Sequence, residues 1–130
     1  MNISEAAAAS GVSAKMIRHY EAIGLVPKPR RTGANYRLYA ESDVHTLRFV
    51  RAARDLGFSM SQIGELLDLW RDRRRPSRKV KALVTGHLRE LERRIAELQA
   101  MKTTLEQLAQ HCHGDERPDC PILERLEGAT

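Results

Sequence analysis

The sequence predicts a mainly α-helical fold, in which a winged helix-turn-helix module is followed by a long dimerisation helix and a C-terminal loop. Three patterns predict it: two short apolar helices that meet at Gly11, a proline-bounded hairpin over residues 27–39, and apolar heptads within residues 77–111. With 130 residues, 42% of them hydrophobic, the chain can bury one modest core. We therefore expect a compact module over residues 1–76, the long helix over 77–111 and a terminal segment over 112–130.

The first 25 residues predict two short helices with a tight turn between them. Gly11 lies where the chain must turn, and Ser13 is placed to cap the second helix, SAKMIRHYEAIGL. In DNA-binding proteins the second helix of such a pair enters the major groove, although short helix pairs also occur in proteins that never bind DNA. The polar face of this helix is expected to carry four candidate DNA-contacting residues: Lys15, Arg18, His19 and Tyr20.

The segment PKPRRTGANYRLY, residues 27–39, predicts a small β-hairpin. Two prolines and a Gly-Ala-Asn turn separate its basic and aromatic residues. A hairpin in this place is a wing, and we expect Arg31 and Arg37 to face DNA phosphates while Tyr36 stacks or hydrogen-bonds at the backbone. Tyr39 is expected to pack the hairpin onto the helices instead.

Two further helices are predicted over residues 41–56 and 59–70, with Ser59 as the cap of the second. Arg54, near the end of the first, is another candidate phosphate contact. The segment RDRRRPSRKV then interrupts the apolar pattern with charge and Pro76, which indicates a connector between modules.

The net charge of +5 lies entirely in the first part of the chain. Residues 1–76 carry 13 Lys and Arg against 8 Asp and Glu, whereas residues 77–130 carry 9 against 9. A basic part of this kind is typical of a phosphate-binding module, but it also improves solubility, so charge alone does not decide the function. No apolar run could span a bilayer and the N-terminus lacks a signal-peptide pattern, so we expect a cytoplasmic protein with reduced thiols and no membrane partner.

The long helix is expected to dimerise. Its apolar residues recur in steps of three and four, with one step of seven, and form a stripe that the small preceding module is too small to cover. A second copy of the chain is the expected partner for this stripe, which consists of Val84, Leu88, Leu91, Ile95, Leu98, Leu105, Ala109 and Cys112.

Cys112 and Cys120 are the only thiols in the chain, and they bracket a polar loop. Structural zinc sites need four ligands, whereas two thiolates suffice for a two-coordinate monovalent ion, so the pair predicts a site for Cu(I), with Ag(I) and Au(I) as equal alternatives. Two alternatives remain open: inert or oxidised thiols, and a site that His111 or His113 assists, which would favour Zn(II) or Cu(II). Pro121 is suited to begin a short helix, PILERLEG, directly after the second thiol.

The order of these elements resembles the MerR family of transcription regulators over essentially the whole chain. The segments SAKMIRHYEAIGLV and NYRLY are similar to that family's recognition helix and wing, and RAARDLGFSMSQIGELL is similar to its second helical pair. The segment CHGDERPDCPI, together with Ser77, resembles the copper-efflux, CueR-like branch, which senses monovalent ions. In branches that take divalent ions, the position of Ser77 is a cysteine.

The resemblance implies a homodimer, with an antiparallel coiled coil, on double-stranded promoter DNA that RNA polymerase also occupies. It implies activation by DNA bending and untwisting when the metal binds, with Ser77 of the partner subunit near the metal but not bound to it. A thiol redox sensor and a drug-responsive regulator of the same fold, without metal, are the alternatives. An enzyme is not expected, because no catalytic set of side chains is recognisable.

Overall fold

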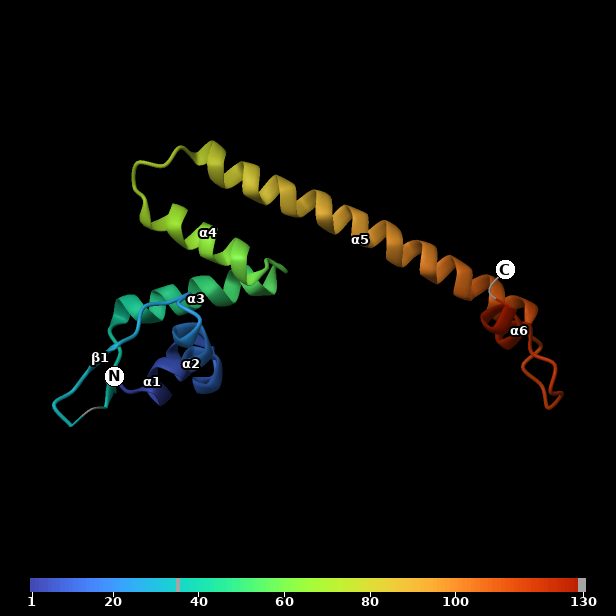
Figure 1. Ribbon diagram of the computed structural model, residues 1–130, viewed down its shortest axis with the longest axis horizontal. Coiled ribbons are helices and arrows are strands. Elements are labelled where there is room, and N and C mark those ends of the chain that lie inside the picture. Colours follow the sequence, from blue (N-terminus) through green and yellow to red (C-terminus); the bar gives the residue numbers. More distant parts are fainter. Residues whose placement is uncertain (35, 129–130) are drawn as a thin grey trace. The chain divides into compact units, whose positions relative to one another are not determined.

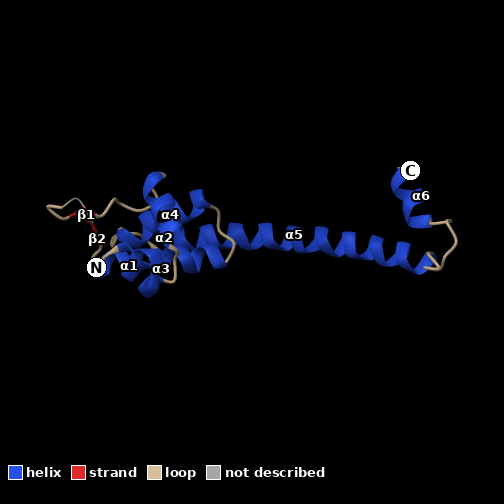
Figure 2. Cartoon of the chain, turned by 90° about the horizontal axis from the view of Figure 1, so that it is seen from below, coloured by secondary structure: helices blue, strands red, loops and turns tan. Residues whose placement is uncertain are grey.

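The computed structural model describes residues 1–34 and 36–128, so Asn35 of the predicted wing turn and the last two residues of the predicted terminal segment lie outside the described residues. Helices dominate the fold, as predicted, and the two short strands form one hairpin (Figure 2). The chain divides into two compact units, Met1–Leu83 and Val84–Thr130. Within the described part of the chain, no helix has the length and apolar character needed to cross a membrane.

Four helices build the first unit: α1 (Ile3–Ser10), α2 (Ala14–Ala22), α3 (Glu41–Asp55) and α4 (Met60–Arg71). α1 packs on α2 and on α3, and α3 packs on α4 (Figure 1). Their inner faces supply one hydrophobic core, which is why helices of only 8 to 15 residues are stable here. The largest side chains fully buried in this core are Tyr20, Ile17, Leu47, Ile63, Leu67 and Val50.

Local hydrogen bonds set the helix boundaries that the sequence predicts. Gly11 adopts the left-handed conformation with φ of 75°, and a Cβ at this position would lie 1.7 Å from Nη1 of Arg51. The Ser13 hydroxyl accepts a hydrogen bond from the Met16 amide at 3.2 Å and so caps α2. The predicted turn and the predicted cap are both confirmed.

The wing is an antiparallel pair of two-residue strands, β1 (Arg30–Arg31) and β2 (Arg37–Leu38). Arg31 lies opposite Arg37 in the ladder. The chain's first residue holds the end of the hairpin, because the Tyr39 amide donates to the Met1 carbonyl at 2.7 Å and the Met1 ammonium donates to the Tyr39 carbonyl at 2.8 Å. The predicted hairpin is confirmed.

The long helix α5 (Ser77–His111) has the predicted bounds, and α6 (Pro121–Gly128) follows it after a loop. Proline at the first position of α6 fits its role there, since that position needs no N–H donor. The apolar stripe of α5 is largely uncovered in the single chain. Five of its side chains are 45 to 65% exposed: Val84, Leu88, Ile95, Leu98 and Leu105.

Ser59→Ala is expected to lower the free energy of unfolding by about 1 kcal/mol. The Ser59 hydroxyl accepts from the Gln62 amide at 3.2 Å, and the Gln62 side chain accepts from the Ser59 amide at 2.8 Å, so the variant removes one bond of a reciprocal cap. Urea unfolding followed by circular dichroism measures the change. Ser61→Ala in the same turn is the control, and an equal loss in both variants would contradict the role of the cap.

Candidate DNA-binding surface and metal site

The exposed face of α2 carries three of the four residues predicted for it. Lys15, Arg18 and His19 are exposed, while Ile17, one position away from Arg18, is fully buried. The alternation follows from helical periodicity, which turns Ile17 toward the core and its neighbours toward solvent. The three polar side chains are therefore available to a groove of DNA.

Tyr20 does not lie on this exposed face, and the prediction that placed it there is wrong. The side chain is 1% exposed, because Tyr20 follows Ile17 by three positions and shares its inward direction. Its hydroxyl reaches the rim of the core, where it accepts a hydrogen bond from Nη1 of Arg54 at 3.1 Å. Tyr20 thus holds Arg54 in place, and Arg54 itself remains exposed.

The wing places its basic residues next to α2. Arg31 and Arg37 are directly opposite each other in the ladder, so their side chains share one face of the hairpin. A surface hollow of about 170 Å³ lies between this face and α2, and four cationic residues line it: Arg18, Lys28, Arg31 and Arg37. Tyr36, at 72% exposure, stands free for a contact with DNA. Lys28 was not among the predicted contacts, although the basic run KPRR signals it.

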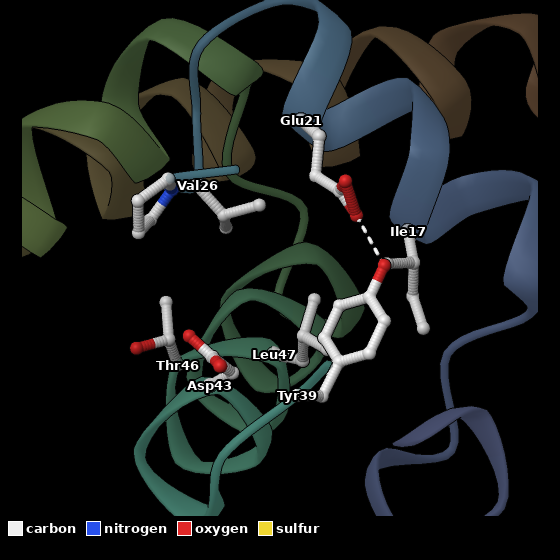
Figure 3. A pocket seen from close by; sticks show the side chains of 8 residues that line it. Ile17, Glu21, Val26, Tyr39, Asp43, Thr46 and Leu47 are labelled. Atoms are coloured by element: carbon white, nitrogen blue, oxygen red, sulfur yellow. Dashed lines mark hydrogen bonds between the residues drawn. The ribbon is translucent and has the colours of Figure 1, made fainter. Parts of the chain in front are cut away.

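Glu21 is a second residue that sequence reasoning missed. It belongs to α2 but is only 5% exposed, and it also lines the basic hollow. The Tyr39 hydroxyl donates a hydrogen bond of 2.6 Å to its Oε1 (Figure 3), and Nε of Arg37 lies 3.9 Å from its Oε2. Tyr39 is buried, as predicted. Burial raises the pKa of Tyr39 to about 12, and the hydrogen bond to Glu21 and its charge act in the same direction.

A cavity of about 10 Å³ lies beside this hydrogen bond, among Ile17, Val26, Thr46 and Leu47 (Figure 3). That volume is on the scale of a single water molecule. The cavity therefore has no room for an organic ligand.

The two cysteines stand at the two ends of the loop that joins α5 to α6. Cys112 follows the last residue of α5, and its amide donates to the Ala109 carbonyl at 3.3 Å. The Cys120 carbonyl accepts from the Glu124 amide at 3.0 Å, so Cys120 is the first residue to pair with α6. Between them, the Asp115 carboxylate accepts from the Arg117 amide at 2.9 Å and from its Nε at 2.8 Å.

The donor set fits a small thiophilic ion. Both cysteines are free thiols of intermediate burial. Among the described residues, no group of three or more His, Cys, Asp or Glu side chains is placed to hold a metal ion. Nδ1 of His111 lies 2.6 Å from the Gln107 carbonyl, which engages this ring nitrogen in the helix.

Ser77 is the first residue of α5, whereas Cys112 follows the last one. A helix of 35 residues is about 52 Å long, because each residue adds about 1.5 Å. Ser77 and Cys112 therefore mark opposite ends of this helix.

Comparison with known proteins identifies the family of the chain. The model of MerR HTH family regulatory proteins matches residues 1–70, and a model described as MerR, DNA binding matches residues 44–108. The chain belongs to the MerR family. It is 63% identical to the heavy metal-dependent transcription regulator 2 of Rhizobium meliloti strain 1021, over 100% of this chain and 88% of that protein. It is 43% identical to the transcriptional regulator CueR of Salmonella typhimurium strain LT2, over 98% of this chain and 93% of that protein.

A solved structure of a transcription regulator extends the likeness to the fold. The transcription regulator PbrR691 from Ralstonia metallidurans CH34, in complex with lead(II), superposes with a TM-score of 0.86 at 31% identity. The match covers 97% of this chain and 98% of that one. The resemblance seen in the sequence is thus confirmed, and this MerR-family chain is a regulatory protein rather than an enzyme.

The stability of this MerR-family protein is expected to fall in alkali through Tyr39. Below about pH 10 the phenol is protonated in the folded and the unfolded protein, so its contribution is complete. From about pH 10 to about 12 the unfolded phenol ionises while the folded one keeps its proton, which lowers the free energy of unfolding by about 1 kcal/mol per pH unit. Urea unfolding at a series of pH values measures the slope. Tyr39→Phe should flatten it, and equal slopes in the two proteins would contradict the assignment.

Proposed function

We propose that this protein is a metal-responsive transcription regulator that binds promoter DNA as a homodimer and activates transcription when Cu(I) binds Cys112 and Cys120. The observation that carries the proposal is the position of the two thiols, Cys112 directly after the end of α5 and Cys120 directly before the start of α6. The names of the relatives, a heavy metal-dependent regulator and CueR, support a metal ion as the signal.

The choice of Cu(I) rests on ligand chemistry. Two thiolates and one monovalent ion leave a net charge of −1, and soft sulfur donors prefer Cu(I), Ag(I) or Au(I) to hard cations. A divalent ion at the same two thiolates would lack ligands. α6 starts directly after Cys120, so the positive end of a helix dipole lies close to the negative charge that a metal-bound pair of thiolates would carry.

The exposed stripe on α5 supports the homodimer. Isolated side chains such as Leu88 and Ile95 are ordinary on a surface, but a continuous apolar stripe along one helix is typical of a coiled-coil seam. An antiparallel arrangement would bring Ser77 of one copy to the end of α5 that carries Cys112 of the other. The neutral hydroxyl would then add neither a third anionic ligand nor a further charge.

The two winged modules of a dimer would read two half-sites of a pseudo-palindromic promoter. In each module Lys15, Arg18 and His19 lie on the exposed face of α2, where they can reach base edges. Contacts with the phosphate backbone fall to the residues around them: Arg31, Tyr36, Arg37 and Arg54.

Activation would come from a change in the shape of the promoter DNA. RNA polymerase would bind the same promoter, in the cytoplasm. Metal binding can shift the dimer only if the thiols are held more favourably in one of its conformations, and coupling of ~1 to 3 kcal/mol is the usual scale. Bending or untwisting of the DNA would then align the promoter elements, while the fraction of promoter occupied by the regulator stays the same.

Cys112→Ser and Cys120→Ser are each expected to abolish Cu(I)-dependent transcription and to leave DNA affinity almost unchanged, because the basic surface belongs to the other unit. The DNA would be a duplex selected from a random-sequence pool by the wild-type protein, placed between the two polymerase-recognition elements of a test promoter. Gel-shift and run-off transcription on that promoter measure binding and activation.

X-ray absorption of the reduced, Cu(I)-loaded wild-type protein provides the coordination number, which should be two with sulfur donors only. His111→Ala is the matched control and should retain the response. A cysteine variant that still activates with Cu(I), or a wild-type protein that selects no DNA, would refute the proposed function.

Ser77→Cys is expected to admit divalent ions. A third thiolate from the second copy would hold the net charge at −1 with Zn(II), whereas with Cu(I) it would leave −2, so Zn(II) binding should appear and Cu(I) affinity should fall. Competitive titration with both ions under anaerobic reducing conditions measures the change. An unchanged metal preference would mean that Ser77 does not approach the thiols.

A further inference from the structure

Glu21 is a buried carboxylate on α2, the helix that we propose contacts DNA, which is itself a polyanion. A buried carboxylate is costly unless hydrogen bonds and a positive charge compensate it. At 5% exposure Glu21 cannot rely on water for this, and its position on α2, one turn beyond Ile17, places it at the boundary between core and basic hollow. Its two oxygens must therefore find partners within the protein.

Both partners come from the wing and the residue next to it. The Tyr39 hydroxyl donates to Oε1 at 2.6 Å, and Nε of Arg37 lies 3.9 Å from Oε2 (Figure 3 shows the first of these contacts). Tyr39 follows β2 directly, and Arg37 is its first residue. A single carboxylate thus joins the recognition helix to the wing.

The wing needs such a contact, because it has little stability of its own. Each strand has two residues, and isolated two-stranded hairpins are marginal in water. Arg31 and Arg37 also lie directly opposite each other, and like charges in that relation repel. The negative charge of Glu21 offsets this repulsion on the side of Arg37, whose side chain is 26% exposed and so is partly held against the protein.

We propose that Glu21 is a positioning residue for DNA binding, which holds Arg37 at the hollow so that the Arg37 guanidinium meets a backbone phosphate. The inference rests on the proposed DNA-binding function and adds a residue that does not touch DNA itself. Arg18, Lys28 and Arg31 complete the cationic lining of that hollow. Tyr39 in turn orients Glu21, because its buried hydroxyl donates a hydrogen bond to one oxygen of the carboxylate.

Glu21→Gln distinguishes this positioning role from a purely electrostatic effect of the carboxylate, because the two predict opposite changes in DNA affinity. The variant keeps the size of the side chain and removes one negative charge beside a polyanion. If Glu21 acted only through its charge, DNA would bind more tightly. If it positions Arg37, DNA should bind about tenfold more weakly, the scale of one lost charged hydrogen bond.

The experiment measures the affinity of the full-length protein for the selected duplex and for a scrambled duplex, by fluorescence anisotropy at several salt concentrations. We expect Glu21→Gln to weaken both, and to reduce the salt slope by about one per half-site, as for a lost phosphate contact. Glu65→Gln is the matched control: it makes the same charge change on an exposed residue of α4, and it should retain wild-type affinity.

A double-mutant cycle with Arg37→Ala tests whether Glu21 acts through Arg37. Once Arg37 is absent, Glu21→Gln should cause no further loss of affinity. Tyr39→Phe, which keeps the carboxylate and removes its hydrogen bond, should weaken binding by a smaller factor, and it decides the matter if Glu21→Gln does not fold. Urea unfolding of each variant shows whether the protein is folded under the binding conditions.

Tighter or unchanged binding by folded Glu21→Gln would overturn the inference, and so would a loss of the same size in the Arg37→Ala background. If Glu21→Gln does not fold, the inference would be overturned by a Tyr39→Phe variant that binds DNA with the same affinity and the same salt dependence as the wild-type protein. These outcomes leave the proposed function intact, since the wild-type protein still binds its duplex. Failure of the wild-type protein to select any duplex would instead refute the proposed function itself.

Discussion

Burial of one face of α2 is the constraint on which the first unit depends. Ile17 and Tyr20 are both withdrawn from solvent, and because they lie three positions apart they fix the rotation of the helix about its axis. With that rotation fixed, Lys15, Arg18 and His19 have one direction left to face. The Tyr20 hydroxyl also accepts a hydrogen bond from Arg54, so the buried face of α2 positions this exposed cation as well. The hydrophobic core therefore decides where the charges of the surface stand.

The second unit differs from the first, because most of the large apolar side chains along α5 are exposed instead of packed in a core. Leu88, Ile95 and Leu98 are each more than half exposed in the single chain. Surface ion pairs such as that between Arg93 and Glu97 add little to the stability of a lone helix. Glu90 also pairs with Arg93, and the hydrogen bond from that guanidinium lowers the pKa of the Glu90 carboxyl. Such contacts organise the polar side of α5, while the apolar stripe stays exposed in the single chain.

Local patterns predicted the helices well, because caps and periodicity act within a few residues. Ser13, Gly11 and Pro76 each lie at a helix boundary that the structure has where the sequence placed it. Tyr20 and Glu21 show where such reasoning fails. An aromatic residue with a hydroxyl suits either face of a short helix, and the burial of a carboxylate depends on Tyr39 and Arg37, which lie 18 and 16 positions away. The proposed metal preference and the proposed dimer would involve a second chain, so the sequence pattern and the fold of one chain do not determine them.

The place of Cys120 has a consequence for how a signal could leave the loop. Cys120 directly precedes α6, and its carbonyl accepts a hydrogen bond from the first turn of that helix, so a force on its sulfur acts on the helix with no flexible segment between them. At the other end Cys112 adjoins α5 in the same way. Binding of the proposed metal ion to both thiols would close a ring of nine residues whose two ends adjoin helices, which reduces the chain entropy lost on closure. The free energy of closure would then be left to reorient α6 rather than to order the loop.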